Sequence, residues 1–279
     1  MVRVTAFAVA VGLFAAAPVL AQQMPTSQPA MLDIIRELEK PGHSVQHQKI
    51  EARWTELNRK QGFPSTYIAL VATSGTPEVW WVNPFAGAGE FGKSLDFGSD
   101  NATYTNAIGQ IAAEDGEHLA SVTRMQAVAV PEASYGAFPS LADMRVYSIL
   151  TVQMRYGYDQ LFMDIAKQYA AIVKAKGVPT TWRSYRIIGG APDGTFLIFN
   201  SFPSWDAVEA NRKAMDAAFG GAAPADLESL MKTVREGVVS STSRFFTVSP
   251  KMSLVSKELA ASNPFWKPKV VAVAKKAAQ

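Results

Sequence analysis

The chain has 279 residues, no cysteine and a formal net charge of +3. Without cysteine, disulfides, zinc–thiolate sites and iron–sulfur clusters are excluded. Removing Arg3 and the four lysines of residues 265–279 lowers the net charge from +3 to −2. Because no basic patch remains outside that terminal segment, we expect no nucleic-acid partner.

The first residues predict an export signal. Arg3 precedes an apolar run from Ala6 to Ala17, and Val19 and Ala21 fit the small-residue positions before a cleavage site. The run is short for a membrane span. We therefore expect residues 1–21 to be a cleaved signal peptide and the mature chain to be exported, periplasmic or secreted, without a membrane span.

The first half of the mature chain predicts alternating strands and helices, after a disordered segment over residues 22–31. Leu32, Ile34, Arg36 and Leu38 alternate as along a strand, and Lys40-Pro41-Gly42 ends it. A helix then extends to about Gln61, where Gly62 is a stop signal. The remaining elements expected in this half are strands 66–73 and 78–82 around a hairpin at 75–77, a glycine-rich loop at 84–92, a helix at 105–120 and a strand at 125–130.

The second half predicts the same order of elements. They are a strand at 145–155, a helix at 158–176, a hairpin of strands 182–188 and 195–200, helices at 204–219 and 225–240, and a strand at 245–248. Residues 34–68 and 149–183 align at an offset of 115, which places Gly42 on Gly157 and Gly62 on Gly177. A repeat of this length is a small domain. We therefore expect two βαββαβ units of ferredoxin-like order, at 32–135 and 144–255, followed by a basic disordered tail over 256–279.

At the turn 40–42, at Gly62 and along the strand 79–83 that ends near Phe85, the chain resembles a known group. It is similar to the dimeric α/β-barrel superfamily, in particular to its NIPSNAP and antibiotic-biosynthesis-monooxygenase branches. The resemblance covers 32–135 and 144–255. It implies an α+β fold in which two tandem ferredoxin-like repeats pack as a pseudo-dimeric α/β barrel within one chain. It also implies a pocket between one sheet and its helices.

The first helix of each half indicates where such a pocket would lie. In the second half, an apolar stripe recurs at helical spacing: Tyr158, Phe162, Ile165, Tyr169 and Ile172. The corresponding residues of the first half are His43, His47, Ile50, Trp54 and Leu57, and Glu51 corresponds to Ala166. Polar residues in place of an apolar stripe predict a pocket with the polar contacts His43, His47, Glu51 and Arg36, and with a wall of Trp54 and Ile50.

Several alternatives remain open at these positions. His43 and His47 are weak metal-ligand candidates, as are His47 and Glu51, and each pair would need ligands from elsewhere. His43 could instead cap the helix, and His47 could be a structural residue bonded to Glu51. Arg36 could bind a carboxylate or form a salt bridge near Glu37 or Glu39.

The resemblance adds one further candidate. Haem-binding members of the superfamily use a helical histidine as axial ligand, and His118 could take that role. His118 lies beside the helical stripe Ile108, Ile111, Ala112, Asp115 and Leu119. No cofactor is predicted from the residues themselves, and haem or a transition metal stays open.

Three functions follow as hypotheses. The first is an exported protein that binds a small apolar or aromatic molecule in the first half. The second is a monooxygenase-like enzyme, cofactor-independent or haem-linked, in which His47 is the base and Arg36 holds the anion. The third is a structural or interaction protein of the cell envelope. Assembly into a further homo-oligomer is open in each case.

Overall fold

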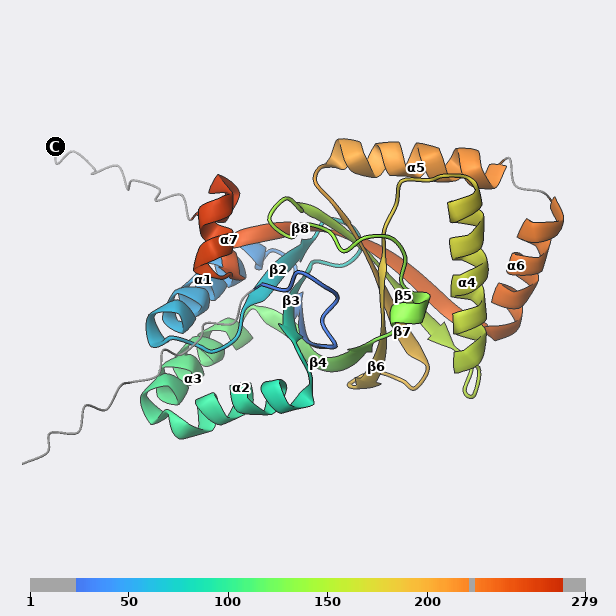
Figure 1. The fold of residues 1–279 in the computed structure, drawn as a ribbon. Helices are drawn as coiled ribbons and strands as arrows, with labels where there is room; N and C mark the ends of the chain where they lie inside the picture. The colour runs from blue at the N-terminus through green and yellow to red at the C-terminus, as the bar shows by residue number, and fades with distance from the viewer. Residues whose placement is uncertain (1–23, 221–223, 268–279) are drawn as a thin grey trace, which may run out of the picture.

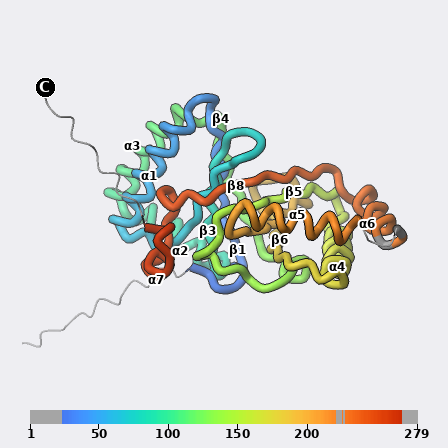
Figure 2. The backbone as a smooth tube through the Cα atoms, turned by 90° about the horizontal axis from the view of Figure 1, so that it is seen from above, coloured from blue at the N-terminus to red at the C-terminus, as the bar shows by residue number. Residues whose placement is uncertain are grey.

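Two groups of helices lie on opposite sides of a closed barrel of strands (Figures 1 and 2). The computed structural model describes residues 24–220 and 224–267. The predictions for the signal peptide and for residues 268–279 lie outside this part of the chain. Within it, no helix is long and apolar enough to cross a membrane.

The first half contains seven elements. They are β1 (Met31–Glu39), α1 (Ser44–Gln61), β2 (Tyr67–Ala72), β3 (Glu78–Phe85), α2 (Ala88–Asp100), α3 (Ala102–Gly116) and β4 (Leu119–Ala129). Gly62 ends α1 in the left-handed conformation, and its N–H is directed at the carbonyls of Asn58 and Arg59. This is the helix stop that the sequence predicts.

The second half repeats this order after a short 3-10 turn, η1 (Pro131–Ala133). Its elements are β5 (Val146–Met154), α4 (Asp159–Ala175), β6 (Arg183–Gly189), β7 (Thr195–Phe202), α5 (Trp205–Gly220), α6 (Pro224–Gly237) and β8 (Val238–Leu254). Helix α7 (Lys257–Ser262) and a second 3-10 turn, η2 (Pro264–Trp266), follow.

The eight strands form one closed antiparallel barrel in the order β1-β3-β2-β8-β5-β7-β6-β4. Each half contributes four neighbouring strands, in the order β4-β1-β3-β2 and β8-β5-β7-β6. The halves join where β2 pairs with β8 and where β4 pairs with β6. Strand β8 pairs with β5 of its own half over its first part and with β2 of the other half over its second, so it forms one of the two joins.

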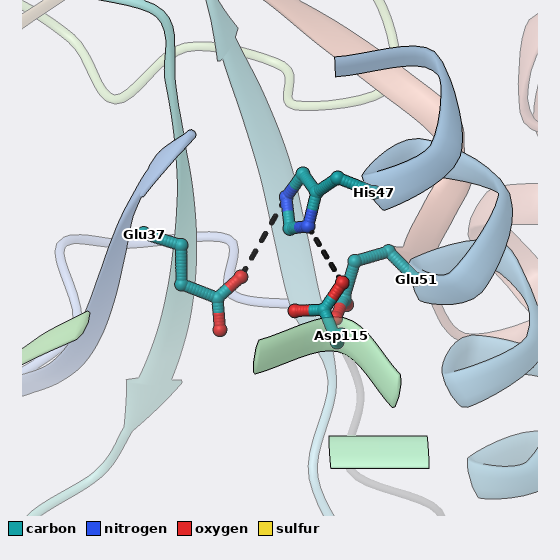
Figure 3. Close-up of side chains that lie close together, drawn as sticks. All are labelled: Glu37, His47, Glu51 and Asp115. Carbon is teal, nitrogen blue, oxygen red and sulfur yellow. Dashed lines mark hydrogen bonds and ion pairs between the residues drawn. The ribbon is translucent and has the colours of Figure 1, made fainter. Parts of the chain in front are cut away.

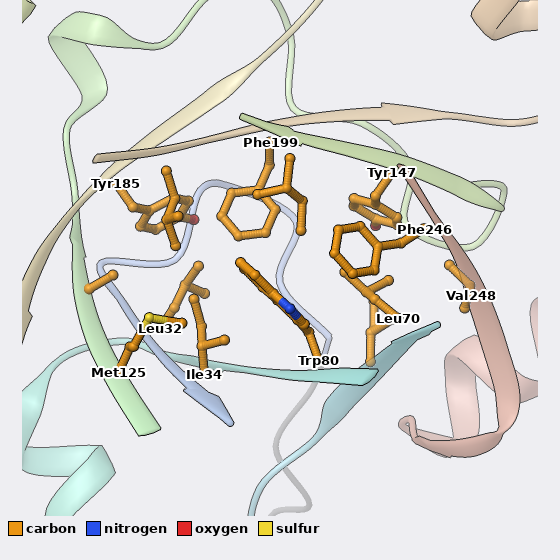
Figure 4. Close-up of a cluster of buried hydrophobic side chains, with 14 of the residues drawn as sticks. Leu32, Ile34, Leu70, Trp80, Met125, Tyr147, Tyr185, Phe199, Phe246 and Val248 are labelled. Carbon is orange, nitrogen blue, oxygen red and sulfur yellow. The ribbon is translucent and has the colours of Figure 1, made fainter. Parts of the chain in front are cut away.

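The core fills the inside of this barrel. Because side chains alternate along a strand, Leu32 and Ile34 of β1 point inward, as does Trp80 of β3 (Figure 4). Trp80 packs against Phe246 of β8, with ring centroids 5.3 Å apart. The adjacent Trp81 points to the opposite face, toward the helices of the first half. The outer face of the β4-β1-β3-β2 sheet is therefore available to form a site with α1, α2 and α3.

Three sequence predictions of elements are wrong. The glycine-rich segment 84–92 is not all loop, because α2 begins at Ala88. The helix expected to reach residue 120 ends at Gly116, and β4 begins at Leu119 rather than near residue 125. Residues 238–240, expected at the end of a helix, are strand instead, because β8 extends from Val238 to Leu254 rather than over 245–248. The early parts of β4 and β8 are largely exposed and polar, so they lack the apolar alternation that marks a strand.

The predicted disorder is also wrong where the structure describes those residues. Trp266 has only 2 % of its surface exposed and belongs to the barrel core. Its indole Nε1 donates to the carbonyl of Ala142 at 3.0 Å. At the other end of the chain, Met24 is buried in the same core. The segments 24–31 and 256–267 are therefore parts of the folded body.

Candidate functional site

Acidic side chains gather on the outer face of the first-half sheet, beneath α1 and α3. Strand β1 alternates, so Glu37 and Glu39 point away from the barrel interior while Leu32 and Ile34 fill it. Helix α1 presents His47 toward these carboxylates. Asp115 of α3 closes the group from the other side (Figure 3).

Glu51 of α1 completes this group. Glu37, His47, Glu51 and Asp115 each offer one ligand atom, and these atoms all lie within 4.8 Å of one another. We call these four residues and Glu39 the acidic cluster. Its members come from one strand and two helices, so only the tertiary fold brings them together.

His47 is the centre of the acidic cluster and is completely buried. Its Nδ1 lies 2.8 Å from Oδ1 of Asp115, at hydrogen-bond distance. Its Nε2 lies 3.7 Å from Oε2 of Glu37 and 3.8 Å from Oε1 of Glu39. These last two distances exceed a hydrogen bond. The prediction of a hydrogen bond between His47 and Glu51 is therefore wrong, because the partner is Asp115.

Three members of the acidic cluster, Glu37, His47 and Glu51, have raised pKa values. Burial raises the pKa of Glu37 to about 8, because a charged carboxylate loses hydration there. Burial, with the charges of Glu37 and Asp115, also raises the pKa of Glu51 well above its ordinary value. For His47, burial alone would lower the pKa, but the hydrogen bond and charge of Asp115 outweigh it and the net pKa is raised.

A cavity of about 270 Å³ adjoins the acidic cluster between the sheet and the three helices. Six of the side chains that line it are aromatic: Trp54, Phe63, Tyr67, Trp81, Phe85 and Tyr104. Glu37 and Glu51 are the members of the acidic cluster that line it, together with Asn58, Asn83 and Arg124. The cavity thus combines aromatic surface with three buried acids, Asp33, Glu37 and Glu51, of which Asp33 is paired with Arg124, and this is the composition of a small-molecule site.

Part of this wall is held by satisfied hydrogen bonds. The hydroxyl of Tyr104 donates to Oδ1 of Asn58 at 2.9 Å, and Nδ2 of Asn58 donates to the hydroxyl of Tyr67 at 2.9 Å. Nearby, Nε of Arg124 donates to Oδ1 of Asp33 at 2.9 Å. In contrast, one oxygen each of Glu37 and Glu51 is buried and without a hydrogen bond. These two acids are therefore the polar groups still free to bind something.

The predicted site residues divide into three groups. Glu51 and Trp54 line the cavity, and His47 lies behind it within the acidic cluster. Ile50 is buried but is not among the residues that line the cavity. His43 is turned away, since its Nδ1 lies 2.8 Å from Nδ1 of His118. His43 also makes no side-chain cap of α1.

Arg36 does not belong to this site. It lies on the inward face of β1 with Leu32 and Ile34, where it forms an ion pair with Glu78 and lies 5.8 Å from the Trp80 ring. The other oxygen of Glu78 lies 3.3 Å from Nε of Arg244. Arg36 faces the barrel interior because side chains alternate along β1, and a side chain on the inward face cannot also face the helices. The expected salt-bridge partners, near Glu37 or Glu39, are wrong for the same reason.

Sequence reasoning missed Glu37, Glu39 and Asp115 as site residues. A signal existed for each. Glu37 and Glu39 share one face of a strand that is otherwise buried, and Asp115 interrupts the apolar stripe of its helix. What the sequence could not show is that β1 and α3 bring these three acids to His47.

The second half has an apolar group in the same place. At the offset of 115, the residues corresponding to Glu37, Glu39, His47 and Glu51 are Val152, Met154, Phe162 and Ala166. All four belong to one hydrophobic cluster, in which Phe162 stacks on Phe196 with centroids 3.8 Å apart. A cavity of about 510 Å³ lies there, with a mainly apolar wall. The acidic cluster is therefore particular to the first half.

No protein-family model matches the sequence, and no curated protein matches it. Solved structures do resemble it. An anthrone oxidase-like protein has a TM-score of 0.53 and 12% identity, over 81% of this chain and 94% of that chain. A candidate monooxygenase from Fusobacterium nucleatum has a TM-score of 0.50 and 9% identity, over 79% and 93%. A chlorite dismutase variant from Candidatus Nitrospira defluvii has a TM-score of 0.49 and 9% identity, over 86% and 98%.

These likenesses bear on the fold. The chain is a mixed α+β protein with a closed eight-stranded antiparallel barrel, consistent with the dimeric α/β-barrel fold that the sequence resemblance implied. At this level of identity, a shared fold does not carry a shared activity, which depends on the site.

A histidine-ligated haem does not fit the cavity of the first half. The chain has three histidines, and none of them lines this cavity. His43 and His118 bond to each other, and His47 is enclosed by carboxylates. No histidine nitrogen is thus presented to a cofactor in the cavity.

Proposed function

We propose that the chain is an exported protein that binds a small aromatic or partly apolar molecule in the cavity of the first half. The observation that carries this proposal is the pairing of the aromatic side chains of the cavity with Glu51, which lines the cavity and keeps a buried oxygen without a hydrogen bond. Leaving a buried polar group unpaired costs about 1–3 kcal/mol, so such groups are retained where something pairs with them. A ligand with a hydroxyl or amino donor on an aromatic ring suits this cavity.

The second half supports the choice of cavity. Its larger cavity has apolar side chains where the first half has the acidic cluster, so it offers little to orient a polar ligand. The strand order common to both halves also supports tandem ferredoxin-like units over 32–135 and 144–255. On this proposal, the two units close one barrel and one of them carries the site.

Native mass spectrometry of the mature protein, purified from the cell envelope, tests the binding proposal. We expect an excess mass that persists in Tyr169→Ala protein and is lost in Trp54→Ala protein. Tyr169 lines the second-half cavity at the position that corresponds to Trp54, so the two variants are matched. An excess mass lost with Tyr169→Ala and kept with Trp54→Ala would assign the ligand to the second half and contradict the proposal.

A second candidate function is oxidation of the bound aromatic molecule. It is favoured by Glu37 and Glu51, which line the cavity and in their ionised form could accept a proton from a ligand. Because the pKa of Glu37 is raised to about 8, its ionised form prevails at alkaline pH. The roles first expected for His47 and Arg36 do not fit, because neither lines the cavity. The name of the anthrone oxidase-like structure, which has a TM-score of 0.53, suggests an anthrone as the probe.

Oxygen consumption with an anthrone tests this second candidate. We expect consumption by the wild-type protein, with a large loss in Glu51→Gln protein that still binds the probe. Asn200→Ala in the second-half cavity is the matched control and should keep the wild-type rate. A rate equal to that of the probe without protein would remove the enzyme hypothesis and leave the binding proposal.

A further inference from the structure

Two buried carboxylate oxygens of the acidic cluster lie near one buried histidine nitrogen, and none of these three atoms has a hydrogen bond. They are Nε2 of His47, Oε2 of Glu37 and Oε1 of Glu39. The two oxygens lie 3.7 Å and 3.8 Å from the nitrogen. These distances are too long for hydrogen bonds, yet they are close to the spacing of neighbouring ligands on one metal ion. Bonds of about 2.0–2.2 Å to a first-row ion separate such ligands by roughly 3–3.6 Å.

The outer contacts of these residues hold them in the orientation that a metal requires. With its Nδ1 bonded to Asp115, His47 keeps its Nε2 lone pair aimed at Glu37 and Glu39. A carboxylate on the far nitrogen of a metal-binding histidine is a common arrangement, because it fixes the tautomer and the ring orientation. The hydroxyl of Ser44 donates to Oε2 of Glu39, which leaves Oε1 of Glu39 for the ion.

The charge of the acidic cluster also favours binding of a cation. Four carboxyl groups surround one imidazole, and across residues 24–220 and 224–267 no Lys or Arg forms an ion pair with any of the four. Buried carboxylates must be neutralised by protons or paired with a cation. A divalent ion would neutralise two of them, and it is the cation that an imidazole can also bind.

We infer that the chain binds one divalent first-row transition-metal ion, of the Mn²⁺, Fe²⁺ or Zn²⁺ class, through Nε2 of His47, Oε2 of Glu37 and Oε1 of Glu39. Asp115 and Ser44 position these ligands. Since Glu37 and Glu51 also line the cavity, a molecule in the cavity would approach the ion from that side. The inference does not depend on the proposed ligand, because the ion is held by the chain alone.

The ligand set differs from the one expected from the sequence. His43 is excluded from it, because its ring bonds to His118 and not to the cluster. Carboxylates from β1 take its place. One imidazole with two carboxylates is a set of nitrogen and oxygen ligands, which favours manganese, iron or zinc over the soft ions that prefer sulfur.

Isothermal titration of the metal-depleted mature protein with Mn²⁺, Zn²⁺ and Co²⁺, each alone and without any organic ligand, tests this inference. We expect one ion per chain for at least one metal, and visible absorption of bound Co²⁺ typical of mixed nitrogen and oxygen ligands. In Glu37→Gln/Glu39→Gln protein, affinity should fall at least tenfold. This variant removes two buried charges, so we expect it to fold, and circular dichroism checks that.

The matched control is His43→Ala/His118→Ala, which removes the two histidines outside the acidic cluster. It should bind with the wild-type affinity and Co²⁺ spectrum. Binding lost in this control but kept in Glu37→Gln/Glu39→Gln protein would place the metal at the histidine pair and overturn the inference. No binding of any of the three ions by folded wild-type protein would overturn it too. Neither outcome affects ligand binding measured by native mass spectrometry on the Trp54 and Tyr169 variants.

Discussion

His47 of α1 and Phe162 of α4 occupy corresponding positions in the two halves of the barrel, yet they are buried among opposite kinds of neighbour. The ring of His47 meets Trp81 edge-on, with centroids 5.7 Å apart, and is enclosed by carboxylates. The ring of Phe162 stacks on Phe196. One backbone arrangement therefore supports a polar interior in the first half and an apolar one in the second.

The stability of the metal-free protein should fall as the pH rises. The pKa of Glu37 is about 8 in the folded protein against an ordinary value of 4.5, and the pKa of His47 is raised as well. The folded state then binds more protons than the unfolded state between about pH 4.5 and pH 8, so the free energy of unfolding decreases across that window.

Urea denaturation at pH 5 and pH 8, with a chelator present, measures this effect. We expect a difference of more than about 1 kcal/mol, and a smaller one in Glu37→Gln protein. Bound metal should reverse the trend, because the ligands must lose protons to bind it. Equal stability of the chelated wild-type protein at both pH values would contradict the prediction.

Replacing the acidic cluster by its second-half counterpart should stabilise the metal-free protein. The variant Glu37→Val/Glu39→Met/His47→Phe/Glu51→Ala/Asp115→Val exchanges buried charged groups for apolar ones, of which the first four already pack together in the other half. Asp115 is replaced as well, because its hydrogen-bond partner His47 is removed. Such exchanges are often neutral or stabilising by about 1–4 kcal/mol. Thermal unfolding with and without Mn²⁺ or Zn²⁺ measures this. We expect a higher melting temperature for the metal-free variant than for the metal-free wild type, and no change in the melting temperature of the variant when metal is added.

The reverse exchange makes the matching control. Phe162→His puts an imidazole among apolar side chains that cannot bond to it, so we expect a loss of about 3 kcal/mol or more. If Phe162→His protein were as stable as the wild type, the apolar neighbours of residue 162 would not disfavour an imidazole, and the prediction would be wrong.

Arg36→Ala should weaken the fold and leave the site intact. The ion pair of Arg36 with buried Glu78 would be lost, although Arg244 remains near that carboxylate. Because Arg36 is partly exposed, we expect a destabilisation of about 1–2 kcal/mol, below the 3–5 kcal/mol of a fully buried pair. Urea denaturation should show this loss while the ligand mass and metal affinity stay at wild-type values. A metal affinity that falls with Arg36→Ala would show that the two faces of β1 are coupled.

Trp266→Ala should destabilise the protein by about 3–5 kcal/mol, as large aromatic truncations in a core do. Trp266 packs in the barrel core and its indole donates to Ala142. Lys257→Ala, on the exposed surface of α7, is the control and should change the melting temperature little. If Trp266→Ala and Lys257→Ala proteins had the same melting temperature, the segment 256–267 would not contribute to the stability of the barrel.

The sequence predicted those parts of the fold whose signals are local. Gly62 ends α1 and the alternation of β1 sorts its side chains because both depend on neighbouring residues. The early part of β8 was missed because its residues become a strand only by pairing with β5, which lies far away along the chain. Trp266 was assigned to a tail because nothing near it in the sequence indicates the barrel core.

The candidate site followed the same division. His47, Glu51 and Trp54 could be found by comparing two helices of one sequence. Arg36 was assigned to the site, although the alternation along β1 places it on the inward face with Leu32 and Ile34. Asp115 could be identified only through tertiary structure, since 68 positions along the chain separate it from His47.

The barrel closes within one chain, so a destabilising acidic cluster is present in one half of the barrel and not in both. In a barrel of two identical subunits, each substitution appears twice, so an acidic interior would burden both halves with buried charge. Here the halves join at the β2–β8 and β4–β6 pairs, and they differ freely in sequence while sharing one core. Selection can then keep the second half apolar and well packed. The first half can carry the buried acidic groups, which selection for packing would remove.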